Sequence, residues 1–179
     1  WGKGFPGWHI ECSAMSMRYL GDNFDIHTGG IDHIPIHHTN EIAQSESSTG
    51  KKFVNYWVHS EFLVLGEQEK MSKSLGNVIN LDTIKEKGFT PMDYRYLCLG
   101  VQYRKRLIFG EDVLKSAANS MQRLRNKIIE IKEENPKKIE LSKLSSESKK
   151  YLEEFKESVF NDLNTPKALA VMWNMLSDN

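Results

Sequence analysis

The stretch Glu69-Lys70-Met71-Ser72-Lys73-Ser74-Leu75-Gly76-Asn77 places two lysines and two serines on one short segment. Lysines three residues apart, here Lys70 and Lys73, can converge on one polyanion, and serine hydroxyls beside them can add neutral donors. A loop of this composition suits the negative charge that builds up on a triphosphate as pyrophosphate leaves. A solvated basic turn is the alternative for two lysines at this spacing. We therefore predict a triphosphate-binding loop here, with the basic turn as its rival.

The composition excludes several classes of protein. The 179 residues carry 24 Lys and Arg against 24 Asp and Glu, so net charge gives no argument for nucleic-acid binding. Two cysteines, Cys12 and Cys98, are too few for a disulfide framework and favour a reducing cytoplasm. No run of about 18 apolar residues occurs, so we expect no membrane span. The chain begins at Trp1 without an initiator methionine, and we expect it to be a piece of a longer protein.

The first part of the chain has the pattern of an α/β fold. Short apolar runs at 24–27 and 62–65 predict strands, and helices are expected at 13–20 and 40–47. Strands that alternate with helices predict βα units and a parallel sheet. The pair Gly29-Gly30 marks a strand end, which is where open α/β sheets place their ligands.

Beyond about residue 80 the pattern turns helical. A short helix is expected from residue 81, and a second from Pro91 to Leu99 with Thr90 as its N-cap. Apolar residues at helical spacing over 113–131 predict a long amphipathic helix, and further helices are expected over 151–160 and from 165 onward. The expected fold is therefore α/β followed by all-α. We predict domains at residues 1–80, 81–110 and 111–179.

Three residues of zinc-binding type occur at suggestive spacing. Cys12 precedes His37 by 25 positions, and Glu41 follows His37 by four. If His37 to Glu41 begins a helix, the two side chains lie on one face. A thiolate, an imidazole and a carboxylate are all competent zinc ligands. Spacing alone leaves the alternatives open, because a lone cysteine is often a small buried residue and a His–Glu pair often lies on the surface.

Four segments together resemble a known family. They are, in chain order and with x for a position that is not part of the match, Gly7-Trp8-His9-Ile10-Glu11-Cys12-Ser13-Ala14-Met15, Asp25-Ile26-His27-x-Gly29-Gly30-x-Asp32, His37-His38-x-Asn40-Glu41-Ile42-Ala43-Gln44-Ser45-Glu46, and the Lys-Met-Ser-Lys-Ser loop. Their order and spacing resemble the cysteinyl-tRNA synthetases, a class I family of aminoacyl-tRNA synthetases. The resemblance implies the second half of a Rossmann-like nucleotide-binding domain, a stem-contact region and an incomplete helical tRNA-binding bundle.

The resemblance also implies a metal and an amino-acid site. Cys12, His37 and Glu41 would bind one zinc ion, while the family's fourth ligand, a cysteine near its N-terminus, has no counterpart here. Zinc binds a thiolate far better than a hydroxyl and would therefore select cysteine over serine. Trp8 and His27 would line the cysteine pocket.

The nucleotide site implied by the resemblance holds ATP with magnesium. Lys70 and Lys73 would be the catalytic pair that stabilises the departing phosphates. The residues that would bind ATP beside Lys73 are Gly29, Gly30, Asp32 and His38. From its position alone, His38 could equally support His37 from outside the metal's own ligands.

The chain departs from the family pattern at several positions. Pro35 precedes Ile36 rather than the histidine pair, Thr39 replaces a glutamate, and His33 adds an imidazole that is a rival metal ligand. The His-Ile-Gly-His element of class I enzymes does not occur. We therefore expect that this chain by itself does not catalyse adenylation.

A basic segment with interleaved tyrosines is the predicted tRNA contact, its alternative being a solvated helix face. Its residues are Lys85, Lys87, Arg95, Arg104, Lys105 and Arg106, with Tyr94, Tyr96 and Tyr103. The resemblance implies a cytoplasmic, monomeric enzyme that joins cysteine to tRNA(Cys) with ATP. Three alternatives stay open: a cysteine ligase with an amine acceptor, a non-catalytic RNA-binding fragment, and a purely structural zinc module.

Overall fold

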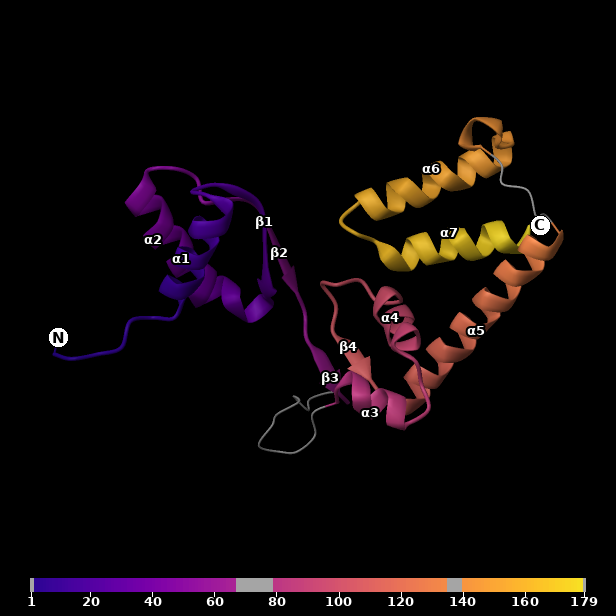
Figure 1. Cartoon of the computed structure of the whole chain (residues 1–179), viewed down its shortest axis with the longest axis horizontal. Helices are drawn as coiled ribbons and strands as arrows, with labels where there is room; N and C mark the ends of the chain where they lie inside the picture. The colour runs from indigo at the N-terminus through magenta and orange to yellow at the C-terminus, as the bar shows by residue number, and fades with distance from the viewer. Residues whose placement is uncertain (1, 67–78, 135–139, 179) are drawn as a thin grey trace. The chain divides into compact units, whose positions relative to one another are not determined.

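The computed structural model describes residues 2–66, 79–134 and 140–178, and the chain forms two compact units, Trp1–Phe62 and Leu63–Asn179 (Figure 1). Each unit has a hydrophobic core of its own, built around Phe53 in the first and around Leu114 in the second. The division after Phe62 assigns the apolar run 63–65 to the second unit. The domain limits predicted at residues 80 and 110 stay predictions.

The first unit is a βαβ arrangement preceded by a helix. Its elements are α1 (His9–Leu20), β1 (Phe24–Gly30), α2 (Thr39–Thr49) and β2 (Val54–Ser60). The two strands pair in parallel, as a connection through a helix allows, from Phe24 opposite Val54 to Gly30 opposite Ser60. The strand at 24–27, both helices and the parallel pairing are thus confirmed. β2 was not predicted, because Val-Asn-Tyr-Trp-Val-His-Ser mixes polar and apolar residues without a clean alternation.

The link from β1 to α2 is irregular and carries both histidines of the pair. A 3₁₀ turn, η1 (Ile31–His33), is followed by a π-helical turn, η2 (Ile34–His38), that runs directly into α2. Thr39 Oγ1 donates to the carbonyl of Ile34 at 2.6 Å across this turn. π-helical turns are rare and often occur at functional sites. Here the turn buries His37 and His38 together.

The second unit begins with two short parallel strands and two helices. β3 (Leu63–Leu65) pairs with β4 (Leu107–Phe109), and α3 (Leu81–Glu86) and α4 (Pro91–Leu99) lie between them in sequence. Asn80 caps α3 by accepting from the Thr83 amide at 2.9 Å. Thr90 and Asp93 form a capping box at the start of α4, so the predicted N-cap is confirmed. β4 is a three-residue strand in a region whose pattern is otherwise helical, and it was not predicted.

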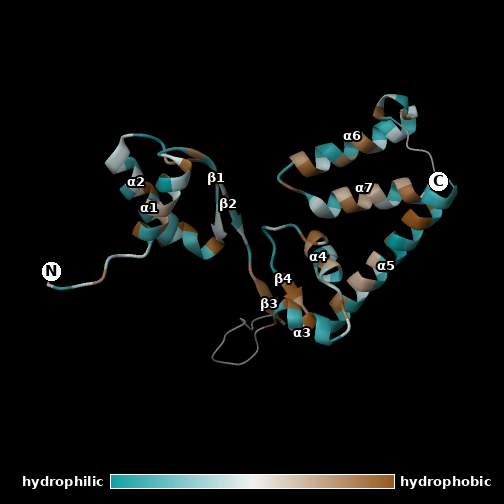
Figure 2. Ribbon diagram, viewed as in Figure 1, coloured by the Kyte–Doolittle hydropathy of each residue, from teal (hydrophilic) through white to brown (hydrophobic). Residues whose placement is uncertain are grey.

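Helices make up the rest of the second unit. They are α5 (Glu111–Glu134), the 3₁₀ turn η4 (Leu141–Lys143), α6 (Ser146–Phe160) and α7 (Thr165–Ser177), which confirms the helices predicted from periodicity. Apolar positions alternate with polar ones along α5 (Figure 2). α6 and α7 lie side by side (Figure 1), and Asn164 caps α7. Among the described residues, no helix is both long enough and apolar enough to cross a membrane.

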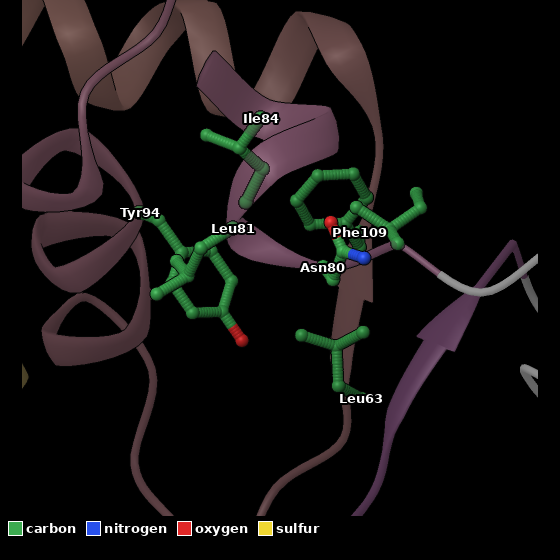
Figure 3. A pocket seen from close by; sticks show the side chains of 7 residues that line it. Leu63, Asn80, Leu81, Ile84, Tyr94 and Phe109 are labelled. Atoms are coloured by element: carbon green, nitrogen blue, oxygen red, sulfur yellow. The ribbon is translucent and has the colours of Figure 1, made fainter. Parts of the chain in front are cut away.

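A small pocket lies in the apolar part of the second unit (Figure 3). Its wall is formed by Leu63, Ile79, Asn80, Leu81, Ile84, Tyr94 and Phe109. Asn80, which bears an amide, is already engaged as the cap of α3. Because Ile79 also packs against the core cluster around Leu114, the pocket is best explained as imperfect packing of this core. The predicted triphosphate loop, with Lys70 and Lys73, lies outside the described residues.

Candidate metal centre

A buried contact between two helices brings the predicted metal ligands together. Ser13 of α1 and Ser45 of α2 are each 1% exposed, and Ser45 Oγ donates to Ser13 Oγ at 3.1 Å. Side chains this small let the two helix backbones approach closely. Cys12 adjoins Ser13, and Glu41 lies one helical turn before Ser45. The same contact therefore directs the thiol and the carboxylate toward one point.

The Cys12, His37 and Glu41 side chains, which the family resemblance implied as metal ligands, lie together. One ligand atom from each lies within 4.8 Å of the other two. Nε2 of His37 is 3.8 Å from Oε2 of Glu41, because the π-helical turn and α2 place the residues one turn apart on the same face. Separations of this size are close to those between the ligands of a tetrahedral zinc ion, which are bonded at about 2.0–2.3 Å.

The Glu41 carboxylate is the most unusual group of the unit. It is 0% exposed, and neither of its oxygens has a hydrogen-bond partner within the described part of the chain. His27, His37 and His38 surround it, with Nε2 atoms 3.1, 3.8 and 3.7 Å from Oε2. A buried carboxylate without donors is strongly unfavourable unless it is neutral or bound to a cation. The site therefore has the features of a metal-binding centre, and its donor set fits zinc.

The electrostatics of the cluster follow from its burial. Burial raises the pKa of Glu41 to about 7 and raises that of the Cys12 thiol, to which the nearby carboxylates of Glu41 and Glu11 also contribute. Burial, reinforced by neighbouring imidazoles, lowers the pKa of His27 and His37 and lowers that of His38 to about 4. In the metal-free cluster, these shifts in pKa therefore favour the neutral forms of the thiol, the carboxyl and the imidazoles. A bound divalent cation reverses this preference for the carboxylate and the thiol.

The residues predicted to hold the amino acid lie at the same centre. The Trp8 ring lies against His37, with ring centroids 3.7 Å apart, and its side chain is 56% exposed. His27 projects from β1 toward Glu41. The structure therefore places an exposed aromatic surface and an imidazole beside the candidate ligands.

The predicted nucleotide-binding residues are divided between two environments. Gly29 permits a close approach, because a Cβ there would lie 2.8 Å from Nδ1 of His33 and would crowd the His38 ring. His38 is 3% exposed, so its side chain belongs to the buried cluster. Gly30 and Asp32 lie at the end of β1 and in η1, and the Asp32 carboxylate folds back against Gly30.

Two residues of β2 were missed by sequence reasoning. His59 Nε2 lies 2.7 Å from Nδ1 of His38, and the Trp57 ring packs against both His27 and His38. The parallel register places Trp57 opposite His27 and His59 opposite Gly29. Trp57 and His59 are two residues apart, so they lie on the same face of a strand. This spacing could have been used as evidence only if β2 had been recognised as a strand.

The basic segment predicted to contact tRNA has internal partners. Three of its cations pair with acidic side chains: Lys85 with Asp82 at 3.0 Å, Lys87 with Glu111 at 2.6 Å, and Arg104 with Asp162 at 2.7 Å. Tyr94 packs against the core, and the hydroxyl of Tyr96 accepts a hydrogen bond from Trp173 Nε1 at 2.8 Å. Much of this segment therefore stabilises the second unit itself.

Known proteins match this chain in sequence and in fold. The model of the family described as "tRNA synthetases class I (C) catalytic domain" matches residues 1–119. The chain belongs to this family of class I tRNA synthetases. The resemblance inferred from the sequence is therefore confirmed.

Three curated relatives that are similar to this chain are named cysteine–tRNA ligases. A Cysteine–tRNA ligase of Treponema denticola is 45% identical over 99% of this chain and 39% of its own length. Cysteine–tRNA ligase 1 of Burkholderia lata is 45% identical over the whole chain, and a Cysteine–tRNA ligase of Koribacter versatilis is 49% identical over 99% of it, each over 36% of its own length. The chain thus spans well under half the length of these relatives.

A solved structure supports the fold. The LeuRS in a ternary complex of Agrobacterium radiobacter K84 agnB2 LeuRS with tRNA and LeuAMS matches 86% of this chain with a TM-score of 0.67. The sequences are 15% identical, and the match covers 22% of that chain. At this identity the likeness concerns the fold, which is that of a class I synthetase.

Proposed function

We propose that the protein containing this chain joins cysteine to tRNA(Cys) in the cytoplasm through an ATP-derived cysteinyl-adenylate. The observation that carries the proposal is the fully buried Glu41 carboxylate, which faces Cys12 and His37 without a hydrogen-bond donor among the described residues. Relatives named Cysteine–tRNA ligase support it.

The metal proposed for this centre is one zinc ion held by Cys12, His37 and Glu41. Zinc at this position would supply an open coordination site that prefers a thiolate to a hydroxyl, which separates cysteine from serine. The Trp8 ring, lying on His37, would cover one side of the pocket, and His27 would contact the amino acid from β1. The chain's own residues thus provide selection and orientation.

Adenylation would depend on positioning and charge neutralisation rather than on a general base. The cysteine carboxylate would attack the α-phosphorus of ATP, and pyrophosphate would leave in line with it. Lys70 and Lys73, accompanied by magnesium, would stabilise the charge that gathers on the departing phosphates. The nucleotide would bind near the end of β1, at Gly29 and Gly30, and Asp32 of η1 would accept hydrogen bonds from its ribose hydroxyls.

The acceptor is proposed to be tRNA, with the second unit as its docking surface. The basic segment also includes Arg95 and Lys105, whose charges could contact tRNA phosphates. Such contacts depend on charge and not on one fixed geometry. We propose that the protein acts as a monomer.

Cysteine-dependent exchange of pyrophosphate into ATP by the full-length protein tests the proposal. We expect exchange with cysteine and little with serine, followed by transfer to added tRNA(Cys). Transfer to a small amine instead of tRNA would identify the rival thiol-forming ligase, and absence of exchange would identify a binding protein. Cys12→Ser is expected to lose both zinc and exchange, whereas Cys98→Ser, the matched change in the second unit, should keep both.

A further inference from the structure

A pocket of about 330 Å³ lies between α5 and α7 in the second unit (Figure 1). α5 lines it with four polar side chains that recur at helical spacing and therefore share one face: Arg123, Asn126, Lys127 and Glu130. α7 contributes the indole ring of Trp173. The pocket thus gathers two cations, one carboxylate and one amide beside an aromatic ring.

The Trp173 ring is held in place and supports an arginine. Its Nε1 donates to the hydroxyl of Tyr96, on α4, at 2.8 Å. The guanidinium carbon of Arg123 lies over the ring, 5.4 Å from its centroid, which is a cation–π contact. A guanidinium stacked on a ring keeps its in-plane N–H groups as donors, and its planar fork loses little freedom when it binds an anion. The stacking therefore prepares Arg123 for an anionic ligand.

The charge of Arg123 is not used within the second unit. Three cations of the segment predicted to contact tRNA pair with acidic side chains. Arg123, by contrast, forms no ion pair with any carboxylate of the described residues, and Glu130, the carboxylate in the pocket, pairs with Lys127 at 3.3 Å. The pocket therefore carries one positive charge that no described group neutralises.

The donors of this pocket fit a phosphate. A guanidinium can bind two phosphate oxygens at once through parallel N–H groups, and a lysine adds a point charge beside it. The Oδ1 atom of Asn126 accepts from Nε2 of Gln122 at 2.8 Å, so the NH₂ group of Asn126 can donate to a ligand oxygen. Charge and hydrogen-bond donors are thus available on the same helix face.

We propose that the pocket between α5 and α7 binds a backbone phosphate of the acceptor tRNA, with Arg123 as the principal contact. The inference rests on the proposed function, from which it takes the tRNA. It assigns the contact to a site outside the basic segment, whose cations are partly engaged within the unit.

Binding of a tRNA(Cys) transcript to the full-length protein at several salt concentrations tests this pocket. Arg123→Gln should raise the Kd about 10-fold and reduce the slope of log K against log salt by about 1 in magnitude, because one phosphate contact is lost. In aminoacylation it should raise the KM for tRNA and leave kcat near that of the wild type. Cysteine-dependent pyrophosphate exchange, which precedes the transfer to tRNA, should stay unchanged and shows that the variant is folded.

Glu130→Gln makes the opposite change in the same pocket. It removes a carboxylate that repels phosphate and releases Lys127 from its ion pair, so the affinity for tRNA should rise by about 2–5-fold. Loss of folding cannot produce such a gain. Arg125→Gln is the matched control, because Arg125 lies two positions from Arg123 on α5, does not line the pocket and points from another face. It should keep the Kd and the salt dependence of the wild type.

The possible failures are distinguishable. Wild-type affinity for tRNA in both Arg123→Gln and Glu130→Gln would overturn the pocket and leave the proposed function intact. A loss in Arg125→Gln equal to that in Arg123→Gln would show a general effect of charge and would also overturn it. A wild-type protein that exchanges pyrophosphate but does not bind tRNA(Cys) would contradict the proposed acceptor together with the pocket.

Discussion

The two units of the chain bury different kinds of side chain. The first has a small apolar core around Phe53 and buries, beside it, two serines, two histidines and the carboxylate of Glu41. The second buries a larger apolar cluster around Leu114, and its buried carboxylate, Asp93, is fully engaged in the capping box of α4. The serines are hydrogen-bonded to each other and His38 lies within hydrogen-bond distance of His59, but the Glu41 carboxylate has no hydrogen-bond partner among the described residues, which is typical of a site that awaits a ligand. The first unit is therefore built around the candidate metal ligands Cys12, His37 and Glu41, and the second around the apolar cluster at Leu114.

The largest effect is expected from removing a ligand of that centre. Cys12→Ser should reduce bound zinc from about one equivalent to a small fraction, because the thiolate is the strongest donor of the set and structural zinc sites gain roughly 10–16 kcal/mol on binding. Metal content of the purified protein by mass spectrometry is the measurement. Cys98→Ser should leave the zinc content unchanged. Equal zinc content in Cys12→Ser and Cys98→Ser would show that Cys12 is not needed for zinc binding, and the first unit would then hold no metal centre of the kind described.

Truncation in the second unit should affect stability and leave the metal alone. Leu114 is 0% exposed, so Leu114→Ala should lower the free energy of unfolding by about 2–5 kcal/mol through lost burial and a residual cavity. Denaturant titration is the measurement, with Val113→Ala, a neighbour that is 42% exposed, as the control. Loss of zinc in Leu114→Ala would show that the centre depends on the core of the second unit.

Substitution of the buried Glu41 carboxylate should raise the free energy of unfolding of the metal-free protein, whereas Leu114→Ala lowers it. Burial raises the pKa of Glu41 to about 7, so the folded metal-free protein holds this proton more tightly than the unfolded chain. The contribution of Glu41 to stability is therefore lost as pH rises from about 4.5 to about 7. Glu41→Gln removes that loss, and at pH 8 the metal-free variant should exceed the metal-free wild type by roughly 1–3 kcal/mol.

The comparison of wild type and Glu41→Gln at pH 5 and pH 8 isolates this group. The histidines of the cluster have lowered pKa values, and their opposing contribution is common to both proteins. Urea titration in the presence of a chelator measures the difference. A variant that is less stable than the wild type at pH 8 would mean that the carboxylate has a compensating partner.

The smallest effect is expected at the cap of α4. Thr90→Ala removes the side chain that accepts from the Asp93 amide and should lower the stability of the second unit by about 1 kcal/mol. Met92→Ala, at a half-exposed position of the same helix, should change it much less. Thermal unfolding provides the measurement. A change as large as that of Leu114→Ala would mean that local capping, rather than apolar burial, stabilises this unit.

The sequence predicted the parts of this contrast that depend on local spacing. The interval from His37 to Glu41 fits one helical turn, and the apolar period over 113–131 fits a long helix; both agree with the structure. The surroundings of Glu41 depend instead on the parallel register of β1 with β2, which juxtaposes His38 and His59 across a long connection. Because β2 lacks a clean alternation, neither that register nor the complete burial of Glu41 could be predicted.

X-ray absorption at the zinc edge, comparing wild-type protein with Cys12→Ser, shows whether the Cys12 thiolate binds the metal. We expect a sulfur shell at about 2.3 Å and a nitrogen or oxygen shell at about 2.0–2.1 Å in the wild type. The sulfur shell should decrease in the Cys12→Ser variant reconstituted with zinc. A sulfur shell that is the same in both proteins would show that Cys12 is not a ligand and that the metal centre is built differently.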